Sequence, residues 1–139
     1  MTWVKVCGLT RESDVSDAVD AGADALGFVL AEESPRRIGT ERAAALMDGV
    51  PALRILVTVD ASRDAIVDLV EATGADGIQP HGQGAQAAAL WAEQAGFFVL
   101  RPVGDGTIDE IPGRQIPLLD SVTARQHGGT GITLDWTAI

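Results

Sequence analysis

Short apolar runs alternate with amphipathic segments along the whole chain. The helical patterns end at four glycines, Gly22, Gly49, Gly74 and Gly96, and each fits the left-handed position that closes a helix. An apolar run follows each of them within a few residues. The strands that we expect are Trp3–Cys7, Ala25–Leu30, Leu53–Val59, Gly77–His81, Phe97–Val103 and Gln115–Asp120. Such near-continuous apolar runs are typical of strands buried on both faces of a parallel sheet.

The segments between these strands have the period of amphipathic helices. Two sets of residues each share one helical face: Val15, Ala18, Val19 and Gly22 in the first helix, and Ile66, Leu69, Val70 and Thr73 in the third. Thr10 and Ser62 are the predicted N-caps. The connection 104–114 is weak as a helix, because it is short and Pro112 interrupts it.

Two of the junctions are nearly the same sequence. The stretches 22–27 (GADALG) and 74–79 (GADGIQ) are two strand–helix units apart. Regular alternation predicts an α/β fold, which a doubly wound sheet and a closed barrel both satisfy. No G-x-G-x-x-G follows the first strand, and the units resemble one another, so we favour a TM-type (β/α)₈ barrel. A full barrel needs at least about 200 residues, so 1–139 is expected to be one partial barrel domain of about six βα units.

Composition limits the partners. The chain has 20 Asp and Glu against 10 Lys and Arg, which argues against nucleic acids and anionic membranes. An anionic substrate would need local positive charge or backbone N–H groups. No apolar run reaches the ~20 residues of a membrane span, and the N-terminus lacks a signal-peptide pattern. The single cysteine cannot form an intrachain disulfide, so we expect a reducing cytoplasm.

Two strand ends carry groups suited to proton transfer. Cys7 closes the first strand just before Gly8 and a helix start, where a thiol ionises more easily and can act as base or nucleophile. A small buried apolar group is an equally good interpretation of a lone cysteine. Asp120 closes the sixth strand, where desolvation suits a carboxyl to act as general acid, although it could instead cap a turn.

Other polar groups follow the remaining strands. Arg36 and Arg37 could clamp a carboxylate or could simply be solvated. Gln79 and His81 alternate on the fourth strand and so point the same way, inward rather than beneath the helices, as substrate contacts or as satisfied core groups. His81 and His127 have no metal-ligand spacing, and we expect no metal.

A glycine-rich segment follows the sixth strand. Gly128, Gly129, Thr130 and Gly131 offer N–H groups for an oxyanion, or form a mobile lid or a plain loop. Asp60 and Asp135 are interpreted as caps and are assigned no chemistry.

In this order the segments resemble the phosphoribosylanthranilate isomerase family. The segments are Val4–Thr10 (VKVCGLT), Gly22–Val29 (GADALGFV), Ser34–Ile38 (SPRRI), Gln79–Gly82 (QPHG), Leu118–Asp120, Gly128–Gly131 and Leu134–Trp136. The resemblance covers the whole chain, and motifs in a common register are specific.

The resemblance implies an Amadori rearrangement in tryptophan synthesis without metal or organic cofactor. N-(5-phosphoribosyl)anthranilate becomes 1-(2-carboxyphenylamino)-1-deoxyribulose 5-phosphate. Cys7 matches the family's general base, which takes the C2′ proton, and Asp120 its general acid, which protonates the ring oxygen. Arg36 matches the residue that binds the anthranilate carboxylate. The implied partner is a small sugar phosphate, with no nucleic acid and no membrane, and a homo-oligomer is left open.

The chain also departs from the family pattern. Family members continue into two more βα units, and sugar-phosphate barrels hold the phosphate with the loops after strands 7 and 8. Without those units the first and sixth strands have open edges. Pro80 stands where the family usually has Leu, which we expect to cost little. The alternative to the isomerase is a non-catalytic truncated barrel acting as an assembly module. A related sugar-phosphate isomerase of histidine synthesis fits less well. Such isomerases resemble barrels in which acidic residues act as both acid and base, whereas the candidate base here is Cys7.

Overall fold

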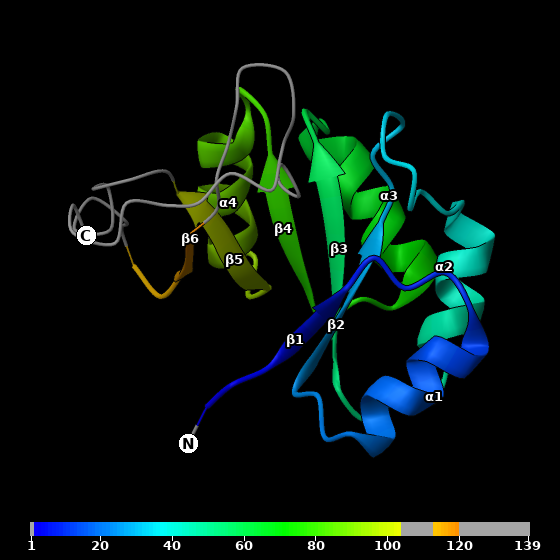
Figure 1. The fold of residues 1–139 in the computed structure, drawn as a ribbon. Coiled ribbons are helices and arrows are strands. Elements are labelled where there is room, and N and C mark those ends of the chain that lie inside the picture. The colour runs from blue at the N-terminus through cyan, green and yellow to red at the C-terminus, as the bar shows by residue number, and fades with distance from the viewer. Residues whose placement is uncertain (1, 104–112, 120–139) are drawn as a thin grey trace.

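The strands pair side by side in chain order, and every pair is parallel. The computed structural model describes residues 2–103 and 113–119. The strands are β1 (Lys5–Cys7), β2 (Ala25–Val29), β3 (Leu53–Val59), β4 (Gly77–His81), β5 (Phe98–Val103) and β6 (Ile116–Leu119) (Figure 1). The helices are α1 (Glu12–Asp20), α2 (Thr40–Met47), α3 (Arg63–Thr73) and α4 (Ala85–Gln94). This order confirms the predicted α/β architecture of a barrel shortened to six strands. Most of the connection 104–114 lies outside the described residues.

The helix ends follow the sequence signals with one exception. Ser62 caps α3, its Oγ accepting a hydrogen bond from the Ala65 N–H at 3.2 Å, and Gly74 closes it in the left-handed conformation. The prediction of Thr10 as a cap was wrong, because α1 begins one residue later, with Arg11 at the N-cap. The Thr10 hydroxyl is thus one position too far back to reach the first free amides of the helix.

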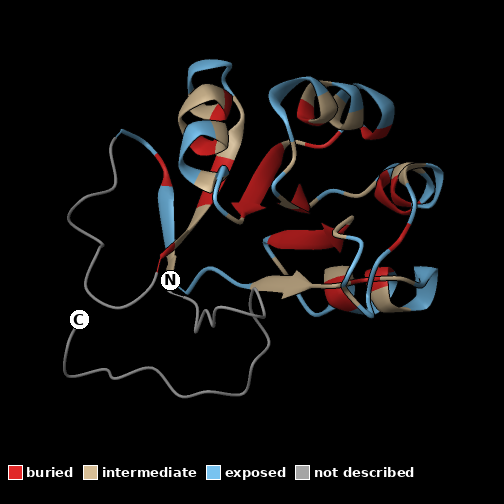
Figure 2. Ribbon diagram, turned by 90° about the horizontal axis from the view of Figure 1, so that it is seen from above, coloured by how far each residue is buried: buried red, intermediate tan, exposed pale blue. Residues whose placement is uncertain are grey.

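Alternate residues of each strand face opposite sides of the sheet. The outer side packs against all four helices; its strand residues include Leu26, Phe28, Leu56, Ile78 and Val99. The inner side holds a smaller apolar cluster of Ala25, Ile55 and Leu100. Seen from above, the helices lie along the outer side of the curved sheet, with buried strands inside them (Figure 2). By this parity Lys5, Cys7, Gln79 and His81 face the barrel interior, whereas Arg54 and Thr58 lie on the outer side with Leu56.

Two prolines end the pairing between β4 and β5. The register has only two pairs, Gly77 with Phe98 and Ile78 with Val99. The Phe98 N–H donates to the Asp76 carbonyl at 3.1 Å, which fixes the phase of this parallel ladder. If the ladder continued with this alternation, its next two hydrogen bonds would need the N–H groups of residues 80 and 102. Both residues are proline and have no N–H group. Pro80 therefore alters strand pairing, an effect that we did not expect from its place at a strand end.

Both outer strands have a free edge within the described part of the chain. The alternation of the β5–β6 ladder turns the nitrogen of Pro117 toward the free side of β6, where its lack of an N–H leaves fewer donors exposed. Large apolar side chains are exposed beside both edges, with Trp3 at 42%, Val4 at 46% and Ile116 at 38%. Both free edges therefore have apolar surface exposed beside them.

The repeated G-A-D motif has the same local role in both units. Asp24 accepts a hydrogen bond from the Val4 N–H at 2.7 Å, and Asp76 accepts one from the Arg54 N–H at 2.9 Å. The amides of both aspartates donate to the carbonyls of these same partners, each at 2.9 Å. The motif thus ties the start of β2 to the start of β1 and the start of β4 to the start of β3.

Asp76 also forms an ion pair with the Arg54 side chain. Arg54 Nε donates to Oδ2 at 2.8 Å and Nη2 donates to Oδ1 at 2.7 Å. These side-chain hydrogen bonds hold the pKa of the Asp76 carboxyl below its usual value. Asp24 has a backbone partner of the same kind but pairs with no arginine among the described residues, so the two copies of the motif differ in charge pairing there.

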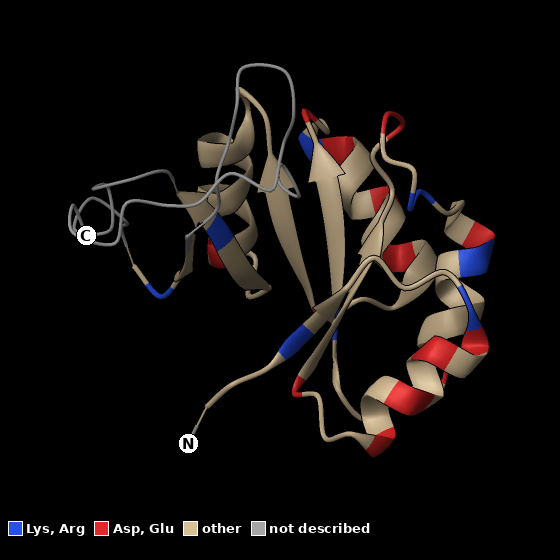
Figure 3. Ribbon diagram, viewed as in Figure 1, with Lys and Arg blue, Asp and Glu red and all other residues tan. Residues whose placement is uncertain are grey.

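Acidic residues lie mainly on the helices and loops, whereas the strands carry few charged residues (Figure 3). In the part of the chain that the structure describes, no helix is long and apolar enough to cross a membrane.

Candidate active site

Gly27 leaves room for two side chains of β1 inside the barrel. Lys5 and Cys7 alternate on β1 and pair in register with Ala25 and Gly27 of β2. A Cβ at Gly27 would lie 2.6 Å from Cys7 Sγ and 3.1 Å from Lys5 Nζ. The thiol and the ammonium therefore sit beside the same point of β2. Cys7 is partly buried and not disulfide-bonded, so it remains chemically available at the carboxyl end of β1.

Gln79 and His81 enter the interior from β4. Ile78 between them belongs to the outer cluster, so their side chains point inward, as strand alternation predicted. Both are 5% exposed, and Gln79 Nε2 lies 2.9 Å from His81 Nε2. The other amide atom of Gln79, Oε1, accepts a hydrogen bond from Lys5 Nζ at 2.7 Å. A polar chain thus crosses the barrel interior from β1 to β4.

Arg36 reaches back from the β2–α2 loop to the end of β1. Its Nη1 donates to the Cys7 carbonyl at 3.1 Å. The side chain passes over Gly8, where a Cβ would lie 2.6 Å from both Cδ and Nη1 of Arg36, and Gly8 has a φ of +84°. Arg37 instead pairs with Glu32 at 3.6 Å in solvent. The backbone of Arg37 bridges to Val29 at the end of β2, but of the two arginine side chains only that of Arg36 hydrogen-bonds to the end of a strand.

Asp60 holds the loop that follows His81. Its backbone N–H donates to the His81 carbonyl at 3.0 Å, and its Oδ1 accepts from the Gly84 N–H at 3.1 Å. The residue has a φ of +48°, which is uncommon outside glycine. Asp60, which we interpreted as a cap, thus holds the carboxyl end of β4 and the loop after it through these two hydrogen bonds.

Several predicted site residues lie outside the described residues. These are Asp120, Gly128, Gly129, Thr130 and Gly131, together with Asp135 and His127. Within the residues described, no group of three or more His, Cys, Asp or Glu side chains could hold a metal ion.

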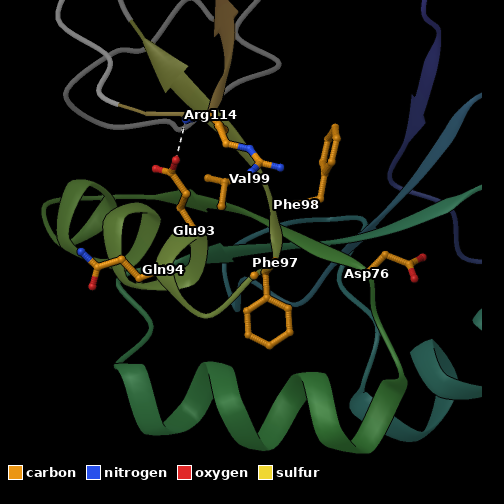
Figure 4. Close-up of a pocket in the computed structure, with 8 residues that line it drawn as sticks. Asp76, Glu93, Gln94, Phe97, Phe98, Val99 and Arg114 are labelled. Atoms are coloured by element: carbon orange, nitrogen blue, oxygen red, sulfur yellow. Dashed lines mark hydrogen bonds between the residues drawn. The ribbon is translucent and has the colours of Figure 1, made fainter.

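An open cavity of about 710 Å³ lies at the opposite end of the strands. It is lined by Asp76, Glu93, Gln94, Gly96, Phe97, Phe98, Val99 and Arg114 (Figure 4). Glu93 accepts hydrogen bonds from the Arg114 N–H and from Gln115 Nε2, and these bonds lower the pKa of its carboxyl. The contacts tie the end of α4 to the start of β6. Because the reacting groups of such barrels lie at the carboxyl ends of the strands, this cavity is not the candidate active site.

Comparison with known proteins decides the family. The model of the N-(5′-phosphoribosyl)anthranilate (PRA) isomerase family matches residues 4–139. The chain belongs to this family. The N-(5′-phosphoribosyl)anthranilate isomerase of Geobacter sp. strain M21 is 38% identical over 140 residues, which are 98% of this chain and 69% of that protein.

Solved structures of the PRA isomerase family show the same fold. The phosphoribosyl anthranilate isomerase of Thermotoga maritima superposes with a TM-score of 0.82 and 30% identity, covering 99% of this chain and 70% of that one. A family structure in complex with reduced 1-(o-carboxyphenylamino)-1-deoxyribulose 5-phosphate has a TM-score of 0.75 and 28% identity, covering 86% and 65%. The chain thus spans about two thirds of its PRA isomerase relatives.

The site contains one residue that our sequence argument did not single out. Lys5 lies on the same face of β1 as Cys7 and contacts Gln79. It is also the only lysine among the 139 residues. The signal was therefore present in the sequence, as a lone lysine two residues from the candidate base in a chain that otherwise uses arginine.

Proposed function

We propose that this chain carries the isomerase chemistry of its family. The substrate is N-(5-phosphoribosyl)anthranilate, the product is 1-(2-carboxyphenylamino)-1-deoxyribulose 5-phosphate, and the pathway is tryptophan synthesis. The observation that supports this most is the family match over residues 4–139, with Cys7 and Arg36 in contact at the carboxyl end of β1.

The reaction requires two proton transfers. Asp120, as general acid, protonates the furanose ring oxygen, so that the C1′–O bond breaks and the nitrogen lone pair forms a Schiff base. Cys7, as base, then takes the proton from C2′, and the electron pair of that bond moves to give the enolamine that tautomerises to the ketone. Acid and base groups of this kind each contribute about 10²–10⁴-fold to the rate.

The remaining site residues would bind the substrate. Arg36 offers a guanidinium to the anthranilate carboxylate, and its bond to the Cys7 carbonyl places this charge next to the base. Gln79 and His81 bind the sugar from β4. Gly128, Gly129, Thr130 and Gly131 supply N–H groups to an oxyanion. No cofactor or metal takes part in this proposal.

The proposed setting follows the family. The partner is a small sugar phosphate rather than a nucleic acid or a membrane, and the compartment is the cytoplasm.

Kinetics of variants test the proposal. In the full-length protein, Cys7→Ala and Asp120→Asn should lower kcat far more than they change KM, because each removes a group needed mainly in the transition state. Asp68→Asn, an exposed carboxylate on α3, is the matched control and should leave both constants unchanged. Near-normal kcat in either site variant would remove that residue from the mechanism.

A further inference from the structure

The polar chain from β1 to β4 determines where histidine protons lie. Lys5 Nζ is a donor without acceptor capacity, so the Gln79 amide atom that faces it at 2.7 Å must be the oxygen. The amide nitrogen then faces His81 Nε2 at 2.9 Å. Because a carboxamide nitrogen only donates, His81 Nε2 must accept and carries no proton. The orientation of the amide follows from the chemistry of lysine.

We infer that Lys5, acting through Gln79, fixes His81 as the neutral imidazole with its proton on Nδ1. Both Gln79 and His81 are 5% exposed, so bulk water offers no easy replacement for either contact. An imidazolium would place an N–H against the N–H of the amide, and the Nε2–H tautomer would do the same. Lys5 and Gln79 are thus positioning residues for His81.

The tautomer limits what His81 can do. Its Nε2 lone pair is occupied by Gln79, so His81 does not remove a proton through that atom. Its Nδ1–H can only donate, so whatever group that atom contacts, in the protein or in a substrate, must be an acceptor such as an oxygen. In the isomerase reaction, an assignment that rests on the proposed function, His81 binds an oxygen acceptor and leaves proton transfer to Cys7 and Asp120. The tautomer itself does not depend on that function.

Nitrogen NMR measures the tautomer directly. The full-length protein is labelled with ¹⁵N-histidine and examined without substrate at about pH 8.5, two units above the ordinary histidine value. The His81 signals are assigned by their loss in His81→Asn. We expect Nδ1–H over Nε2–H by at least about ten to one, the preference of a charge-assisted hydrogen-bond chain. A predominant Nε2–H form would overturn the inference.

Three variants test the role of Lys5 and Gln79. Gln79→Glu keeps the shape but removes the donor, so His81 should switch to Nε2–H. Lys5→Met should reduce the tautomer ratio at least about tenfold, because the amide can then flip, whereas Lys5→Arg should keep it. An unchanged ratio in Lys5→Met shows that Lys5 does not position His81. Since Lys5→Met and Gln79→Glu test separate links, misfolding of one leaves the other decisive, and neither needs isomerase activity.

Discussion

Gly27 and Cys7 face each other across the β1–β2 pair so closely that a Cβ at Gly27 would lie 2.6 Å from Cys7 Sγ. The position of the thiol, and not the backbone conformation of residue 27, therefore requires a glycine here. Gly27→Ala should force Cys7 and Lys5 to move and should lower the free energy of unfolding by about 1–3 kcal/mol, the usual cost of overpacking. Urea denaturation of the full-length protein measures it.

The matched control for Gly27→Ala is Gly84→Ala. At Gly84 a Cβ would meet only Asp60 Oδ1, at 3.9 Å, which is an ordinary contact. Its effect on the denaturation midpoint should be clearly smaller. Equal effects of the two substitutions would show that space beside Cys7 is not what requires glycine.

Thr58 on β3 has a buried hydroxyl with no hydrogen-bond partner among the residues that the structure describes. Thr58→Val keeps the shape and removes the unsatisfied oxygen, so we expect it to raise the free energy of unfolding by about 1 kcal/mol. Thr73 is equally buried, but its Oγ1 donates to the Leu69 carbonyl at 2.7 Å. Thr73→Val should therefore lower stability, and thermal unfolding of the two variants should shift in opposite directions.

The Arg54–Asp76 ion pair gives stability a dependence on pH. Its hydrogen bonds lower the pKa of Asp76 in the folded state, so the stabilisation is complete above the unfolded-state value near ~4 and disappears as pH falls through the folded-state value. Asp76→Asn should cost about 1 kcal/mol at neutral pH, since the pair is partly exposed to water. The difference from wild type should shrink on acidification from pH ~4.5 toward ~2.

Asp14→Asn is the control for Asp76→Asn. Asp14 pairs with Arg11 at the surface of α1, and the same direction of pKa change applies there. Its pH profile should differ from wild type by much less, because water screens the pair. If Asp76→Asn matched wild type at every pH, the ion pair would contribute nothing to folding.

Of the two arginines after β2, we expect Arg36 to contribute to substrate binding and Arg37 to contribute little. Arg36 contacts the Cys7 carbonyl, while Arg37 pairs with Glu32 in solvent. Arg36→Ala should weaken substrate binding by about 1.5–3 kcal/mol through loss of a charge-assisted contact, and Arg37→Ala should change it little. KM and direct titration with a product analogue measure both. The reverse ranking would make Arg37 the clamp.

A polypeptide of residues 1–139 alone should not reach an enzyme-like rate. Its β1 and β6 edges are open among the described residues and are flanked by exposed Trp3, Val4 and Ile116. We expect it to be aggregation-prone, oligomeric or partly unfolded. Adding a C-terminal segment of the family as a separate polypeptide should restore solubility and activity. A soluble, fully active monomer of 139 residues would contradict this expectation.

Much of the fold could be predicted because the sequence repeats one signal, a glycine that ends a helix and is followed by an apolar run. Strands β3 and β4 begin and end where the apolar runs do, and Ser62 caps α3 as its position predicts. Thr10 failed because a helix start is uncertain by one residue without knowledge of the preceding turn. That turn passes through Gly8, over which the Arg36 side chain packs from a distant loop.

The interior of the site was harder to predict than its strand ends. Alternation placed Gln79 and His81 on one face but could not show that Lys5 reaches them from three strands away. Contacts of this kind depend on barrel curvature and on the absence of a side chain at Gly27, neither of which is local in sequence. The roles of Cys7, Asp120 and Arg36 remain predictions.

The proline pair between β4 and β5 also has a consequence for how the molecule opens. Beyond the pairs Gly77–Phe98 and Ile78–Val99 the register of these two strands does not continue among the described residues, so the wall of the barrel is weakest there. Native-state hydrogen exchange should divide at this line, with the amides of β2 and β3 opening only with the whole molecule and those of β5 and β6 opening earlier as a separate cooperative unit. Proline at two adjacent rungs thus divides one continuous sheet into parts that can exchange on different timescales.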